Sequence, residues 1–181
     1  MAHALHSPMQ GEPTNMTNTI TARKLVPAPI TSETFAPYGQ LIVPTEDGVP
    51  FGQDDAQLDL TRGTPRFYIM RLPNRGMGFD RITRHAQVTQ CLASVDGVDW
   101  YIAVAAPSEN PDDEPGPEDI TAFHVPGNVA IKLHLGTWHV GPFFTPGDVS
   151  FFNLELADTN IVDHQNCDLV ARYGVAIELT V

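Results

Sequence analysis

The chain is predicted to fold as an all-β barrel or sandwich, because three features of its sequence agree. Short apolar runs of strand length recur between residues 24 and 179, turns rich in Gly, Pro and Asp separate them, and helical periodicity is almost absent. Many short strands with such turns are typical of antiparallel barrels and sandwiches. No fixed repeat is evident. We therefore expect a disordered leader over residues 1–21 and one domain over residues 22–181.

The individual elements follow from local patterns. Thr31 is expected to cap a short helix that Pro37 and Gly39 end. Phe67 and Ile69 alternate with their neighbours, as in a strand with two largely apolar faces. Residues 47–63 should form a long loop, and the acidic, Pro-rich residues 107–119 a solvated excursion. Strands are predicted at 24–28, 40–43, 66–72, 79–85, 88–93, 100–106, 120–125, 129–134, 149–156 and 173–179, with 79–85 paired to 88–93.

Composition excludes several classes of partner. Ten basic and twenty-two acidic residues give a net charge of −12, which disfavours nucleic acid and anionic membranes as partners. No apolar run reaches the roughly 18 residues of a membrane helix. Cys91 and Cys167 form neither a disulfide framework nor a metal motif, so we expect free thiols in a reducing compartment, the cytoplasm. An anionic substrate would need positively charged side chains at its site to overcome the repulsion from the negative net charge of the protein.

Two stretches have the spacing of a pair of metal-binding motifs. Thr83-x-His85, Gln90 and Gly97 follow the layout of the first cupin motif, and Gly136 with His139 that of the second. The chain thus resembles a cupin-like antiparallel β-barrel, or jelly roll, with a few short helices. Thr83 and Gln90 stand where cupins carry a histidine and a glutamate, so the standard ligand set is incomplete.

Further motifs resemble one family within the cupins, the ureidoglycolate lyases. The likeness extends from about Lys24 to Asp168. It is carried by Arg84-His85 with Thr89-Gln90, His134 with Trp138-His139, the segment 151–155, and Asn166-Cys167-Asp168. The resemblance implies an enzyme, usually a homodimer, that cleaves ureidoglycolate to glyoxylate and urea during allantoin breakdown. The one cofactor that the resemblance implies is a divalent metal, Ni²⁺. If a metal is bound, its expected ligands are His85, Gln90 and His139.

The chemistry of that reaction matches the residues present. Loss of urea requires removal of a hydroxyl proton and protonation of the departing nitrogen, for which histidine is suited near neutral pH. The carboxylate of the substrate needs a cation. We expect three catalytic histidines, His85, His134 and His139, and substrate contacts from Arg84, Thr89, Gln90, Lys132, Trp138 and Glu155. Which histidine acts as acid and which as base stays open.

Two alternatives remain at this point. Lys132 and Glu155 depart from the family pattern near the expected pocket, and the loop before residue 63 lacks the family's Asn-Asn-Gly segment. These departures allow a related cupin enzyme acting on another small hydroxy or keto acid. The incomplete metal motif allows a non-catalytic cupin that binds a small anion.

Overall fold

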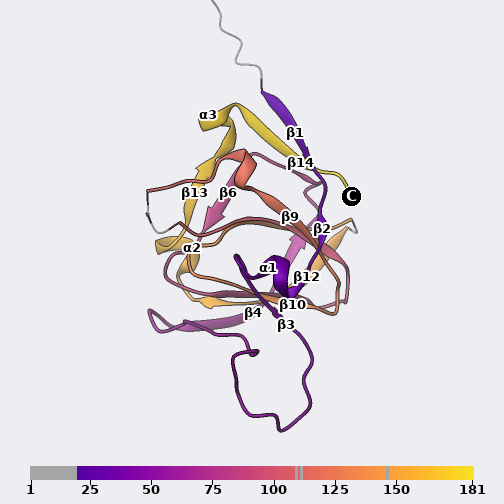
Figure 1. Ribbon diagram of the computed structural model, residues 1–181, viewed down its shortest axis with the longest axis vertical. Coiled ribbons are helices and arrows are strands. Elements are labelled where there is room, and N and C mark those ends of the chain that lie inside the picture. Colours follow the sequence, from indigo (N-terminus) through magenta and orange to yellow (C-terminus); the bar gives the residue numbers. More distant parts are fainter. Residues whose placement is uncertain (1–19, 109, 111, 146) are drawn as a thin grey trace, which may run out of the picture.

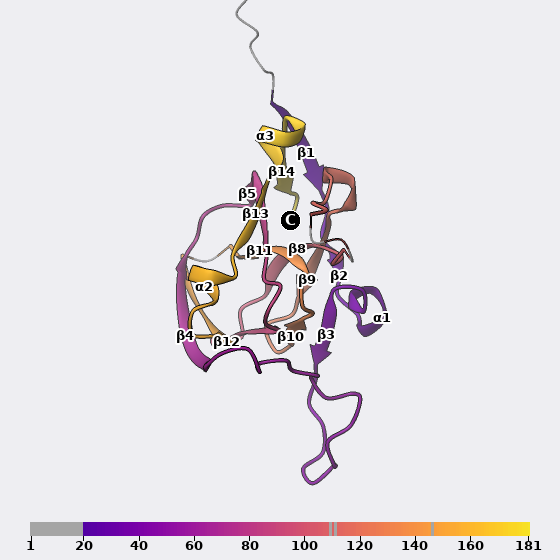
Figure 2. The same cartoon turned by 90° about the vertical axis from the view of Figure 1, so that its left-hand side faces the viewer.

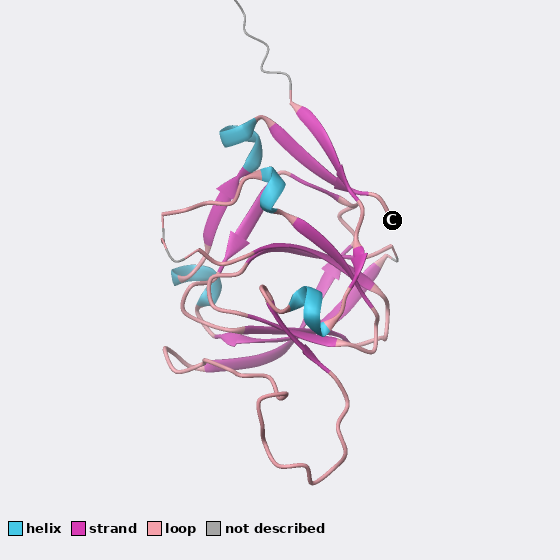
Figure 3. Ribbon diagram, viewed as in Figure 1, coloured by secondary structure: helices cyan, strands magenta, loops and turns pink. Residues whose placement is uncertain are grey.

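The computed structural model describes residues 20–108, 110, 112–145 and 147–181, and its regular structure is almost entirely β (Figures 1 and 3). The all-β prediction is confirmed. Most of the predicted leader lies outside the described residues, and the first strand begins at Thr21. Within the described part of the chain, no helix is long and apolar enough to cross a membrane.

A five-stranded antiparallel sheet forms one wall of the molecule. Its order is β3-β10-β7-β12-β4. Gly39 lies where β3 meets β10, and a Cβ there would fall 2.0 Å from the carbonyl oxygen of Lys132, so only glycine allows this approach. The strands are β3 (Gly39–Ile42), β10 (Ala130–Leu133), β7 (Gln90–Ser94), β12 (Asp148–Leu156) and β4 (Pro65–Pro73).

A six-stranded sheet forms the opposite wall, in the order β13-β6-β11-β8-β9-β2. All its pairs are antiparallel except β2 with β9. The strands are β13 (Gln165–Asp168), β6 (Arg81–Arg84), β11 (Trp138–Phe143), β8 (Trp100–Ala105), β9 (Thr121–Val125) and β2 (Ala28–Pro29).

Within the described residues, a small third sheet and four short helical segments complete the fold. The sheet has the order β1-β14-β5, with β1 parallel to β14. Thr31 caps α1 as predicted, and Asp168 caps α3 through the backbone N–H of Ala171. The remaining bounds are β1 (Thr21–Leu25), β14 (Val175–Leu179), β5 (Gly78–Phe79), α1 (Ser32–Phe35), η1 (Pro117–Asp119), α2 (Thr159–Val162) and α3 (Leu169–Tyr173).

Apolar side chains hold these layers together in two clusters. Trp100 and Phe123 of the six-stranded sheet meet Phe151 and Ile131 of the five-stranded sheet in the first cluster. The second lies on the other face of the six-stranded sheet, where Ile82, Trp138 and Ala103 pack against β14 and α3. Each large side chain buried in this way stabilises the fold by about 1.5–3 kcal/mol. The two clusters thereby fix the positions of the large sheets, which Figure 2 shows from the side.

The predicted pairing of residues 79–85 with 88–93 is wrong. β6 pairs with β11 and β13, whereas β7 pairs with β10 and β12 in the other sheet. The chain crosses between the sheets at residues 85–89. The carboxylate of Asp163 stabilises this connection, because it accepts hydrogen bonds from the backbone N–H groups of Ala86 and Gln87. The crossing places His85 and Gln90 at the edge of the space between the two walls.

Candidate active site

A pocket of about 290 Å³ lies between the two large sheets, and we call it the interior pocket. β4, β7 and β12 line it from one wall, and β6 and β11 from the other. Its polar side chains belong to Tyr68, Arg75, Thr83, His85, Gln90, His139, Asn153, Glu155, Asn160 and His164.

Three imidazole rings meet in this pocket. The ring centroids of His85 and His139 are 5.2 Å apart, and those of His85 and His164 are 5.6 Å apart and nearly perpendicular. His85 follows β6, His139 lies on β11, and His164 precedes β13. These strands are neighbours in the six-stranded sheet, which is why residues far apart in sequence gather here.

The backbone fixes the tautomers of two of these histidines. Nδ1 of His85 donates to the carbonyl oxygen of Asp163, and Nδ1 of His139 donates to the carbonyl oxygen of Thr137 at 3.1 Å. A carbonyl oxygen can only accept, so in each neutral ring the hydrogen sits on Nδ1. Nε2 of both rings therefore carries a lone pair, which can accept a proton or bind a metal ion.

Burial keeps both rings neutral at physiological pH. Desolvation lowers the pKa of His85, and this is opposed by its hydrogen bond to Asp163 and by the negative charges of Asp163 and Glu155. Desolvation, followed by repulsion from His85, lowers the pKa of His139 to about 3. Several neighbours of His85 stabilise its protonated form, so His85 is the more basic of the two rings.

A buried hydrogen-bond network lies beside the histidines. Nε2 of Gln90 donates to Oδ1 of Asn153 at 3.1 Å and to Oε2 of Glu155 at 3.0 Å. The Tyr68 hydroxyl donates to Oε1 of Glu155 at 3.2 Å and accepts from Nδ2 of Asn153. Oε1 of Gln90 is buried and has no hydrogen-bond partner among the described residues. It is an acceptor that a ligand with N–H or O–H groups could satisfy.

The donor set for a metal ion is incomplete. Two imidazole nitrogens and the Gln90 amide oxygen are available, whereas Glu155 is engaged by Gln90 and Tyr68. Within the described part of the chain, no group of three or more His, Cys, Asp or Glu side chains is placed to hold a metal ion. Divalent transition metals in proteins usually have at least three such ligands. These residues do not fit a tightly held Ni²⁺.

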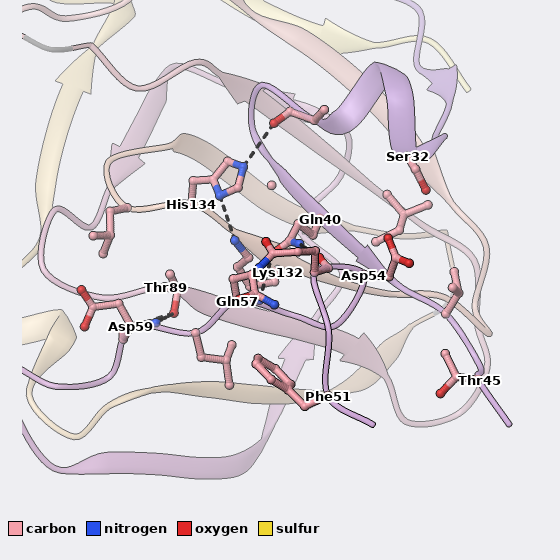
Figure 4. Close-up of a pocket in the computed structure, with 17 residues that line it drawn as sticks. Ser32, Gln40, Thr45, Phe51, Asp54, Gln57, Asp59, Thr89, Lys132 and His134 are labelled. Atoms are coloured by element: carbon pink, nitrogen blue, oxygen red, sulfur yellow. Dashed lines mark hydrogen bonds between the residues drawn. The ribbon is translucent and has the colours of Figure 1, made fainter. Parts of the chain in front are cut away.

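The remaining residues expected at the site lie elsewhere. Lys132, His134 and Thr89 line a separate pocket of about 1000 Å³ on the outer face of the five-stranded sheet (Figure 4). Lys132 is opposite Cys91, and Leu133 opposite Gln90, so alternation along the strands sends Lys132 and Gln90 to opposite faces. We call this second space the outer pocket. The sequence predicted a single pocket for residues that in fact line the interior pocket and the outer pocket separately.

Arg84 and Trp138 support the fold beside the interior pocket without lining it. Nε of Arg84 donates to Oε1 of Gln165 at 2.6 Å, and its guanidinium lies 4.7 Å from the centre of the Trp138 ring. Trp138 is 2 % exposed and belongs to the second apolar cluster. Together they tie β6, β11 and β13 into register, which positions His85 and His139 indirectly.

Sequence reasoning missed several residues that line or support the pocket. Asn153 could have been found, because it shares the strand face of Glu155 at a spacing of two. Tyr68 faces the pocket through the same alternation on β4. No local signal marks Arg75, Asp163 or His164, whose positions depend on how the sheets pack.

The family model described as Ureidoglycolate lyase matches residues 22–177 of the 181. No curated protein matches the chain. The match covers nearly all of the described fold, and it includes His85 and the strands that carry Gln90, His139 and Glu155. The chain therefore belongs to the ureidoglycolate lyase family, and it is a lyase of purine catabolism that cleaves ureidoglycolate into glyoxylate and urea.

Proposed function

We propose that the interior pocket is the site of ureidoglycolate cleavage, with His85 as the proton-transfer group. The observation that carries this proposal is the neutral His85 ring, whose Nδ1–H is held by the Asp163 carbonyl while its Nε2 lone pair stays available. The ring sits among polar groups inside a small cavity, and ureidoglycolate is a small polar molecule.

The reaction needs one proton to move within the substrate. The hydroxyl O–H bond and the carbon–nitrogen bond break, while the carbonyl of glyoxylate and an N–H bond of urea form. Nε2 of His85 takes the hydroxyl proton and delivers it to the departing nitrogen, so no net proton is consumed. Burial lowers the pKa of His139 to about 3, so His139 acts as a neutral neighbour that accepts a hydrogen bond from the substrate.

Two other residues orient the substrate in this proposal. Arg75 lines the pocket, and no described residue forms an ion pair with it, so its guanidinium is free to bind the substrate carboxylate. Oε1 of Gln90 lacks a partner and can accept a hydrogen bond from the urea group. In this orientation the substrate carboxylate lies at Arg75, its urea group at Gln90 and its hydroxyl near His85.

We also propose that the protein is a cytoplasmic homodimer. The outer face of β4 and β12 supports dimerisation, because Phe67 and Ile69 are more than half exposed there and Phe67 stacks on Phe152. Both cysteines are free, which agrees with a reducing compartment. Fractionation of the source cells tests the location, since recovery outside the cytoplasmic fraction would contradict it.

The site is tested by following glyoxylate and urea release from racemic ureidoglycolate. His85→Ala should lower kcat/KM by about 100-fold to 10,000-fold, as expected for loss of a general base, and His139→Ala by at least tenfold. His124→Ala is the matched control, because His124 lies on β9, hydrogen-bonded to Asp99 and away from the pocket. If His85→Ala retains the activity of the His124 control, the proposed site is wrong.

A further inference from the structure

Lys132 is a buried cation without a carboxylate partner among the described residues. It is 2 % exposed, and none of the ion pairs of the described chain includes it. Its Nζ donates one hydrogen bond, to Nδ1 of His134 at 2.8 Å. An ammonium group has three N–H donors, so two have no acceptor within the described residues. A buried charge in this condition is costly unless an anion compensates it.

His134 positions this ammonium group without neutralising it. Nε2 of His134 lies 3.1 Å from the carbonyl oxygen of Ala36, which can only accept, so the ring hydrogen sits on Nε2 and donates to it. Nδ1 then accepts from Lys132. Desolvation and the charge of Lys132 both lower the pKa of His134, which keeps the ring neutral. The pair therefore presents a single oriented positive charge to the outer pocket (Figure 4).

The walls of the outer pocket define the kind of anion that fits. Leu41, Phe51 and Leu58 provide apolar surface, while Asp54 and Asp59 are carboxylates at the same pocket. The two aspartates repel any anion, and they repel a dianion such as phosphate about twice as strongly as a monoanion, so an anion with one negative charge fits best beside the single cation. The apolar wall suits a hydrocarbon substituent.

The loop that closes the pocket is held in place by side-chain amides. Oε1 of Gln40 accepts from the backbone N–H of Gln57 at 3.0 Å, and Nε2 of Gln57 donates to the carbonyl oxygens of Gly52 and Asp55. Thr89 likewise accepts from the backbone N–H of Asp59 at 2.9 Å. These bonds shape the space around Lys132 in advance of any ligand.

We propose that the outer pocket binds a small organic monocarboxylate, whose carboxylate accepts hydrogen bonds from Lys132. The site is separate from the interior pocket, because Lys132 and Gln90 project from opposite faces of the same sheet. The protein thereby carries a second binding site for a small acid.

Calorimetric titration of the full chain with butyrate tests this proposal. The wild-type protein should bind butyrate and should bind butyramide, which lacks the charge, at least tenfold more weakly. Lys132→Met should lower butyrate affinity by at least tenfold, and Lys132→Gln provides a second uncharged variant if the first does not fold. Arg75→Gln, which removes the cation of the interior pocket, should leave butyrate affinity within twofold of wild type.

Three results would overturn the proposal. The first is absence of butyrate binding to the wild-type protein at millimolar concentrations, and the second is unchanged affinity in a folded Lys132 variant. The third is loss of binding in Arg75→Gln, which would place the carboxylate in the interior pocket. Tighter binding of inorganic phosphate than of butyrate would contradict the preference for a single charge.

Discussion

Gln90 controls the character of the interior pocket at the scale of a single residue. Its amide N–H groups satisfy Glu155 and Asn153, so a buried carboxylate is hydrogen-bonded although none of the ion pairs of the described residues includes it. A glutamate at this position, as in metal-binding cupins, would place two carboxylates about 3 Å apart. The amide therefore provides two donors to the network and one unpaired acceptor to the pocket.

We predict that Gln90→Glu lowers the free energy of unfolding by about 2–5 kcal/mol at pH 7, because it buries a second charge beside Glu155. The deficit should shrink at lower pH, since the folded state raises the pKa of the added carboxyl and protonation then removes the repulsion. Urea denaturation at pH 7 and pH 5 measures both effects. Gln90→Met is the control, with a smaller deficit that is less dependent on pH. If the Gln90→Glu variant is as stable as the wild-type protein, the hydrogen-bond network around Gln90 and Glu155 is wrong.

At the scale of elements, the crossing between β6 and β7 builds the site. Asp163, which follows α2, joins this crossing to the segment before β13 through its carboxylate and its carbonyl oxygen. The backbone N–H of Gly136 also donates to the carbonyl oxygen of His85 at 2.7 Å. The orientation of His85 thus depends on three segments that are distant in sequence.

Asp163→Ala should lower kcat by about 10-fold to 100-fold, as is typical when a partner that orients a histidine is lost, with a smaller change in KM. Asp163 is a positioning residue, and Asp163→Asn should recover part of kcat because its amide oxygen keeps one acceptor. The free energy of unfolding should fall by only about 1–2 kcal/mol, since Ala86 and Gln87 are accessible to water. A rise in KM alone would contradict this role.

The strands were largely predictable from sequence, but their partners were not. Alternation on 66–72 and 149–156 located β4 and β12 to within one residue at each end. β11 and β13 were missed, because Gly141-Pro142 interrupts the first and polar Gln165 and Asn166 open the second. Pairing of β6 with β7 failed because a short connection favours a hairpin, and only the Asp163 carboxylate shows why the chain crosses instead.

The candidate site was likewise only partly predictable from the sequence. Motif spacing brought His85, Gln90 and His139 together, the family resemblance added Glu155, and all four line the interior pocket. Spacing could not tell which sheet face a strand residue occupies, so Lys132 and His134 were assigned to the same pocket. Arg75 and His164 depend on long-range packing, which no local pattern encodes.

At the scale of the whole molecule, the five-stranded sheet carries a different surface on each face. Its inner face lines the interior pocket, whereas its outer face bears Lys132 at one end and the exposed Phe67 and Ile69 at the other. A row of exposed aromatic and branched side chains on β4, at a sheet edge, is an association hazard for a monomer. A second copy of the chain would cover it.

We therefore predict that light scattering of the purified protein gives the mass of a dimer. The double variant Phe67→Glu/Ile69→Glu should give a monomer, because like charges would oppose each other across the interface. Arg81→Glu, on β6 of the six-stranded sheet and paired with Asp168, is the control for a change of charge away from this face. A monomeric wild-type protein would contradict the proposed assembly.

In the proposed reaction, neutral His85 in the interior pocket accepts the substrate proton. The most direct test is the pH dependence of kcat/KM, which reports groups of the free enzyme. Burial lowers the pKa of His85 from its usual 6.5, so activity should be constant near pH 7–8 and fall at a midpoint below 6.5 as the ring becomes protonated. This acid limb should be absent from the residual activity of His85→Gln. The same limb in both proteins would contradict the claim.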